Sequence, residues 1–149
     1  MKKLLLGVCT GNSCRSPMLE ALVRQELKKQ GKNEKWETLS AGTALVAEAG
    51  FPATDHAVTA MRNRGLDISK HRSRFVGPLL GRLPLTVIFC LTRRHKECLL
   101  ALEPGLAEYC KIICPEADVL DPFGGDEARY ESCAQELEAL AVKVVSELD

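Results

Sequence analysis

A cysteine and an arginine separated by five residues lie close to the N-terminus, in the segment VCTGNSCRSP at residues 8–17. An apolar run precedes this segment, and a helical pattern follows it. A loop that joins a strand to a helix directs backbone N–H groups and the positive end of the helix dipole toward a bound anion. The spacing therefore predicts a phosphate-binding loop. Its residues are Thr10, Gly11, Asn12, Ser13, Cys14 and Arg15.

Within this loop Cys9 is the predicted nucleophile, because positive potential favours its thiolate form and Ser16 is placed to donate a hydrogen bond to the sulfur. Arg15 adds a planar guanidinium that holds two phosphoryl oxygens at once. Gly11 and Asn12 are residue types that adopt the positive φ angles such a loop needs. Together they predict in-line attack of the thiolate on phosphorus. The alternative, a Gly-Asn turn with two incidental thiols, is disfavoured by the strand and helix on either side.

The elements that must position this loop are readable along the whole chain, because apolar runs alternate with helical patterns. This alternation predicts one α/β domain over residues 1–149: a four-stranded parallel sheet with helices on both faces and the phosphate loop after strand one. The first helix is expected to begin after Ser16, with Pro17 at its first position, and to end at Gly31. Residues 42–53 are expected to be irregular. The strands are expected at 4–9, 36–42, 83–92 and 109–114, and the helices at 17–31, 54–65, 93–105 and 127–148.

Composition excludes several classes of protein. Twenty basic and twenty acidic residues cancel, which disfavours a nucleic-acid or membrane-surface binder, and no apolar stretch approaches the roughly 20 residues of a membrane span. Seven cysteines without paired spacing fit reduced thiols in the cytoplasm. The three histidines, His56, His71 and His95, lack the spacing of metal ligands, so neither a metal nor another cofactor is expected.

In the loop at residues 8–17 the sequence resembles the low-molecular-weight protein tyrosine phosphatase family, whose signature V-C-x-G-N-x-C-R-S-P is matched by VCTGNSCRSP. The resemblance covers the whole chain and includes SAG at residues 40–42, KHRSR around His71, and the dipeptide of Asp121 and Pro122. It implies a phosphorylated protein or peptide as substrate, no nucleic-acid or membrane partner, and a monomer or weak dimer.

The resemblance also implies a role for each matched residue. Cys9 corresponds to the nucleophile, Arg15 to the phosphate clamp and Ser16 to the partner of the thiolate. Asp121 corresponds to the general acid, which the chemistry requires because the leaving group needs a proton and the later attacking water needs a base. The resemblance further implies that three residues hold the loop in its conformation: Asn12, Ser40 and His71.

Two features bear on which phosphate is removed. Ser13 stands where tyrosine-specific members commonly carry a bulky aliphatic residue, and a small polar residue leaves room beside a flat, charged guanidinium. The stretch DPFGG, with Phe123 after the acid, and TRRHKE at 92–97 resemble the protein-arginine phosphatase branch. We therefore predict hydrolysis of phosphoarginine through a phosphocysteine, with Ser13 and Phe123 in the substrate pocket and phosphotyrosine as the alternative substrate.

Two further alternatives remain open from the sequence. Thioredoxin-coupled arsenate reductases share the fold and need two more cysteines to carry oxidation away from the nucleophile. Cys90 and Cys98 lie near the right region, but their spacing departs from that class and Cys90 sits in an apolar strand pattern. A non-catalytic phosphopeptide-binding module is disfavoured because Cys9, Arg15 and Asp121 are all present.

Overall fold

The computed structural model describes residues 2–82 and 86–149 and confirms the α/β prediction. Each predicted strand and helix is present, with ends shifted by a few residues, and 83–85 of the third predicted strand lie outside the described residues. The strands are β1 (Lys3–Cys9), β2 (Trp36–Gly42), β3 (Thr86–Cys90) and β4 (Cys110–Ile112). The helices are α1 (Arg15–Lys29), α2 (Asp55–Arg62), α3 (Arg93–Leu102) and α4 (Glu127–Ser146), with 3-10 turns η1 (Leu45–Ala49), η2 (Gly77–Arg82) and η3 (Pro104–Leu106).

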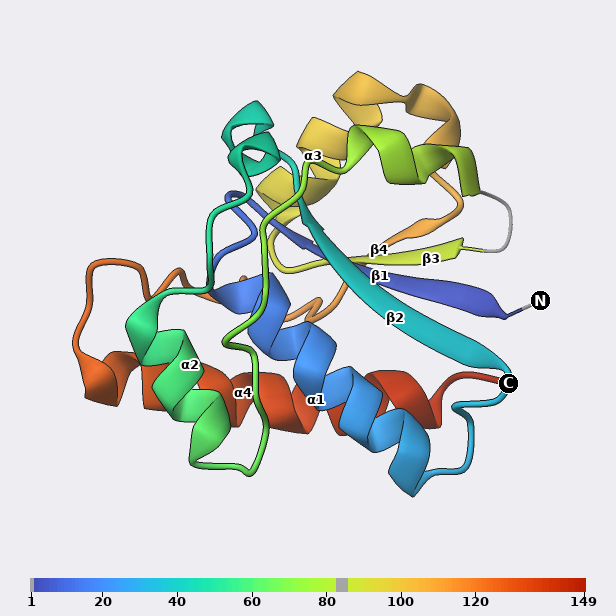
Figure 1. Ribbon diagram of the computed structural model, residues 1–149. Coiled ribbons are helices and arrows are strands. Elements are labelled where there is room, and N and C mark those ends of the chain that lie inside the picture. The colour runs from blue at the N-terminus through green and yellow to red at the C-terminus, as the bar shows by residue number, and fades with distance from the viewer. Residues whose placement is uncertain (1, 83–85) are drawn as a thin grey trace.

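The four strands are parallel, in the order β2-β1-β3-β4. The chain leaves β1 toward β2 on one side and later crosses to β3 on the other, so the strand order reverses at β1 (Figure 1). In open α/β sheets, ligands bind at the carboxyl ends of strands at such a switch point. The loop after β1 therefore starts where a ligand site is expected.

Helices cover both faces of the sheet, as predicted. Helices α1, α2 and α4 pack together on one face, and α3 with the 3-10 turns η2 and η3 lies on the other (Figure 1). Alternate β1 residues supply the two cores: Leu5 and Cys9 face the α1 side, whereas Leu4, Leu6 and Val8 face the α3 side. Because both faces are buried, β1 reads as a continuous apolar run. This alternation points the Cys9 side chain toward α1.

The first helix begins earlier than predicted. It starts at Arg15, with Cys14 as the residue before its first turn, so Ser16 lies inside the helix and Pro17 is its third residue. Proline is tolerated there because the first N–H groups of a helix have no partner within the helix. Gly31 follows the helix end with a φ of 69°, the left-handed conformation that favours glycine. Across the described residues, no helix is both long and apolar enough to cross a membrane.

Candidate active site

The segment between Cys9 and Arg15 forms a tight loop from the end of β1 to the first residue of α1. Asn12 has a φ of 58° and is the one non-glycine residue of the described chain with a positive φ. Gly11 does not adopt a positive φ, so that part of the prediction is wrong. One left-handed residue is enough to turn the chain, and asparagine adopts this conformation more readily than most residues.

Asn12 is fully buried and ties the loop to three other segments. Its Nδ2 donates to Ser16 Oγ at 2.8 Å and to Ser40 Oγ at 3.0 Å. Its Oδ1 accepts from the backbone N of Arg74 at 3.0 Å, and its backbone oxygen accepts from His71 Nε2 at 2.7 Å. The structure thus brings together Asn12, Ser40 and His71 behind the loop. These bonds hold the left-handed turn in place.

Gly42, at the end of β2, lets the loop pack closely against the sheet. A Cβ atom at this position would lie 2.6 Å from the backbone oxygen of Thr10 and 2.6 Å from the Cβ of Ala47. Both distances are far below van der Waals contact, so any side chain here would displace the loop. The glycine of the SAG segment is therefore explained by close approach.

Cys9 is 2% exposed, and its sulfur lies 2.9 Å from Ser16 Oγ. Because Ser16 Oγ already accepts a hydrogen bond from Asn12, its own proton is left to donate to the sulfur. A donated hydrogen bond stabilises the charged form of its acceptor. The chain of contacts from Asn12 through Ser16 therefore directs a hydrogen-bond donor at the sulfur of Cys9.

Cys14, the second thiol of the loop, is in a different environment. Burial, helped by the nearby Cys9 and Asp121, raises the pKa of Cys14 from 9.0 to about 12. Its Sγ donates to Asp121 Oδ1 at 3.5 Å. Cys14 is therefore a protonated donor at neutral pH, and its sulfur contacts Asp121.

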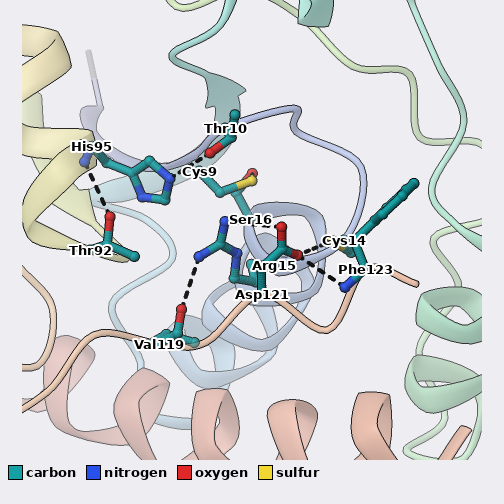
Figure 2. A network of polar contacts seen from close by, with 10 residues as sticks. All are labelled: Cys9, Thr10, Cys14, Arg15, Ser16, Thr92, His95, Val119, Asp121 and Phe123. Atoms are coloured by element: carbon teal, nitrogen blue, oxygen red, sulfur yellow. Dashed lines mark hydrogen bonds and ion pairs between the residues drawn. The ribbon is translucent and has the colours of Figure 1, made fainter. Parts of the chain in front are cut away.

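Arg15 is buried and points across the loop toward the segment before α4 (Figure 2). Its Nη1 donates to the backbone oxygen of Val119 at 2.9 Å, and its Nη2 lies 3.6 Å from Asp121 Oδ2. The Nε of Arg15 is buried with no hydrogen-bond partner among the described residues. An unpaired guanidinium N–H in a pocket suits an oxyanion ligand, because a buried donor without an acceptor is destabilising.

Asp121 combines a fixed position with access to solvent. Its side chain is 50% exposed, and its Oδ1 accepts from the backbone N of Phe123 at 3.0 Å. Figure 2 shows the carboxyl group beside Arg15 and Cys14. A carboxyl group held at the pocket in this way can exchange protons with a leaving group and with water.

A pocket of about 630 Å³ lies over these groups. Ser13 and Phe123 line it, and so do the large apolar side chains of Val46 and Phe51, which are 58% and 47% exposed. The sequence reasoning missed Val46 and Phe51 because residues 42–53 were expected only to be irregular. Exposed apolar residues in a loop were the signal that could have found them. The pocket lining is Cys9, Thr10, Gly11, Ser13, Cys14, Arg15, Val46, Phe51, Pro52, Ala53, Thr54, Asp55, Asp121 and Phe123.

The sequence reasoning also missed His95 as part of the site. Its Nε2 lies 2.9 Å from Thr10 Oγ1, at the edge of the phosphate loop (Figure 2). The segment TRRHKE was noted only for a resemblance, and no spacing rule links His95 to a loop 85 residues earlier.

Comparison with known proteins identifies the class of protein that this fold and site represent. The family of low molecular weight phosphotyrosine protein phosphatases matches residues 4–149, and the chain belongs to this family. The protein is therefore a protein phosphatase, and its substrates are phosphorylated proteins.

Named relatives fall into two groups. The chain is 33% identical to the protein-arginine-phosphatase of Bacillus subtilis, an alignment that covers 97% of this chain and 95% of the relative. It is 32% identical to the low molecular weight protein-tyrosine phosphatase A of Mycobacterium tuberculosis, over 83% of this chain and 78% of the relative. The crystal structure of a low molecular weight protein tyrosine phosphatase from T. tengcongensis superposes with a TM-score of 0.88 at 34% identity, over 99% and 100% of the two chains.

Proposed function

We propose that this phosphatase hydrolyses phosphoarginine in proteins through a phosphocysteine intermediate on Cys9. The observation that carries this proposal is Ser13, a small polar side chain in the wall of the pocket where the thiol lies. A guanidinium is planar, charged and hydrated. It therefore loses less hydration free energy when it binds beside a hydroxyl than when it binds beside a branched alkyl group. The relative in Bacillus subtilis that is named a protein-arginine-phosphatase supports the same substrate class.

The first chemical step transfers the phosphoryl group to the enzyme. The Cys9 thiolate attacks phosphorus, so that an S–P bond forms as the P–N bond to the guanidino nitrogen breaks. Asp121 gives its proton to that nitrogen, and the arginine side chain departs as its guanidinium cation. Arg15 and the loop N–H groups bind the equatorial oxygens, whose charge they stabilise in the transition state.

The second step restores the enzyme. Asp121, now a carboxylate, accepts a proton from water as the water oxygen attacks the phosphocysteine. The S–P bond breaks and inorganic phosphate is released, while Ser16 donates its hydrogen bond to the returning thiolate, 2.9 Å away. The 50% exposure of Asp121 supports this role, because the group must meet a water molecule after the leaving group has left.

Phosphotyrosine is a second candidate substrate, and the aromatic side chains of the pocket favour it. Phe51 and Phe123 present exposed rings at the pocket, and a phenyl ring packs on them well. The same rings also stack on a guanidinium, so they do not discriminate between the two substrates. Ser13 does discriminate, because it removes apolar contact that only the phenyl ring would use.

The buried position of Cys90 argues against arsenate reduction. This thiol is fully buried in β3, and its hydrogen bond with Cys110, together with burial, raises its pKa. A cysteine that relays oxidation to thioredoxin must ionise and be reached from solvent. The alternative of a non-catalytic module that only binds phosphopeptides is disfavoured because the chain belongs to a phosphatase family.

A comparison of kcat/KM on phosphoarginine and phosphotyrosine peptides tests the proposal, with arsenate plus thioredoxin as a third arm. We expect the wild type to prefer phosphoarginine, and Cys9→Ser to retain less than about one per cent of activity. Ser13→Ile adds about three carbon contacts at about 0.8 kcal/mol per buried methylene, so we expect the ratio to shift at least about tenfold toward phosphotyrosine.

Ser13→Thr is the matched control, because it retains the hydroxyl and adds only a methyl group, and it should move the ratio much less. If the wild type ignores phosphoarginine, or if Ser13→Ile leaves the ratio unchanged, phosphotyrosine becomes the preferred substrate.

A further inference from the structure

His95 is a buried histidine of α3 that contacts the phosphate loop and has no role in the two chemical steps described above. The residue is 3% exposed, and its Nε2 lies 2.9 Å from Thr10 Oγ1. Thr10 directly follows Cys9, and its exposed side chain lines the pocket. The contact therefore connects helix α3 with a hydroxyl group at the pocket.

The position of the His95 ring is fixed by the start of α3. Thr92 precedes the helix and accepts a hydrogen bond from the backbone N of His95 at 3.2 Å. Figure 2 shows the ring extending from this first turn toward Thr10 and Cys9. A capped first turn holds its side chains in place more firmly than a loop would.

The ring is neutral at physiological pH. Burial is the main cause, and the charge of Arg15 adds to it; together they lower the pKa of His95 from 6.5 to about 4, against a smaller opposing effect of Asp118 and Asp121. The N-terminal end of α3 also disfavours a cation. A neutral imidazole carries one N–H donor and one bare nitrogen acceptor.

The environment of the other ring nitrogen decides which nitrogen carries the proton. His95 Nδ1 is buried and has no hydrogen-bond partner among the described residues. Buried N–H groups without an acceptor are rarer and costlier than unpaired acceptors. The proton therefore sits on Nε2, which donates to Thr10 Oγ1. This donation leaves the proton of the Thr10 hydroxyl free to point elsewhere.

We infer that Thr10 donates its hydroxyl proton to a phosphoryl oxygen in the pocket, and that His95 is the positioning residue that aims it. The inference rests on the proposed function of the pocket but not on the choice between phosphoarginine and phosphotyrosine. Thr10 then adds a side-chain donor to the backbone N–H groups and Arg15. This hydrogen bond stabilises the charge on the equatorial oxygens in the transition state. Its loss should therefore lower kcat more than it raises KM.

The test compares four variants on p-nitrophenyl phosphate. Thr10→Val keeps the shape of the side chain but removes the hydroxyl, and we expect kcat to fall about tenfold to a hundredfold, the effect of one hydrogen bond to a charged group. Thr10→Ser keeps the hydroxyl and should stay within about threefold of wild type. His95→Leu should lose as much as Thr10→Val, whereas His95→Gln, whose amide N–H can replace Nε2, should recover most of the activity.

The double variant Thr10→Val/His95→Leu separates positioning from general damage. If His95 acts through Thr10, the double variant should be no slower than Thr10→Val alone. Losses that multiply would overturn the inference, and so would a Thr10→Val enzyme with wild-type kcat. Thermal melting of each variant shows whether His95→Leu is folded, and His95→Gln supplies the comparison if it is not.

Equilibrium binding of orthovanadate gives the same comparison without turnover. Thr10→Val should weaken vanadate binding at least about tenfold, and Thr10→Ser should not. An enzyme that binds vanadate with this pattern but hydrolyses neither phosphate substrate would contradict the proposed function and leave the role of Thr10 intact. Equal vanadate affinity in wild type and Thr10→Val would contradict the role of Thr10 alone.

Discussion

Acid sensitivity of folding is expected to follow from the buried His95. The folded protein lowers the pKa of this residue from 6.5 to about 4, chiefly because burial disfavours the charged ring. Between these two values the unfolded chain binds a proton that the folded chain rejects. The contribution of His95 to the free energy of unfolding is therefore fully present above pH 6.5, and it is lost progressively as the pH falls toward 4.

The size of the effect follows from the two pKa values. One pKa unit corresponds to about 1.36 kcal/mol, so the difference between 6.5 and about 4 amounts to about 3 kcal/mol of unfolding free energy. This is a large share of the 5–15 kcal/mol typical of a domain. The charges of Asp118 and Asp121 act on the same ring in the opposite direction, and their smaller effect is already included in the lowered pKa of His95.

Urea unfolding of wild type and His95→Gln, measured in steps from pH 7 to pH 4, isolates the histidine. Glutamine does not titrate, so the wild type should lose about 3 kcal/mol more than the variant over this range, whatever the two stabilities at pH 7. His56→Gln, at an exposed position on α2, is the matched control and should follow the wild type. Parallel profiles for wild type and His95→Gln would refute the reasoning, because they would show that His95 does not resist protonation.

Two further predictions concern the loop and the acid. Asp121→Ala should slow hydrolysis most for poor leaving groups, because an activated ester needs less protonation. Measurement of kcat/KM across aryl phosphates of differing leaving-group pKa checks this prediction. An equal loss for all esters would exclude Asp121 as the general acid. Peroxide should oxidise Cys9 to a sulfenic acid, which condenses with the thiol of Cys14 to a disulfide and releases water, so that thiols restore activity. Cys14→Ser should make the inactivation irreversible, and mass spectrometry should find the reducible Cys9–Cys14 link only in the wild type.

Much of the fold and of the loop could be predicted because the signals are local. Alternating apolar and helical segments determine the order of elements, and a parallel sheet then brings the carboxyl ends of its strands together. Only a short loop separates Cys9 from Arg15 in the sequence. That both belong to one site could therefore be predicted without knowing how distant segments pack.

Features that depend on packing between distant segments could not be predicted in the same way. Phe51 reaches the pocket because residues 45–51 fold over the loop, where Ser73 Oγ donates to the oxygen of Ala47 at 2.6 Å and accepts from the nitrogen of Phe51 at 2.8 Å. His95 meets Thr10 because β1 and β3 are adjacent in the sheet. The error at Gly11 has a different cause: residue type shows which positions tolerate a positive φ, whereas the fold decides which one uses it.

The phosphate loop is held from two sides by contacts with other segments of the protein. Asn12 is bonded to α1, β2 and the segment around His71, whereas Thr10 is bonded to α3, which lies on the opposite face of the sheet. Donors that are already oriented need no rearrangement as charge develops on the phosphoryl oxygens, and such preorganisation is a main source of electrostatic catalysis. Because the partners of Asn12 and of Thr10 lie in different segments of the chain, loss of one set of contacts should loosen only its own side of the loop. Changes at Asn12 should therefore disturb Cys9 through Ser16, while changes at His95 should leave Cys9 in place and misdirect Thr10.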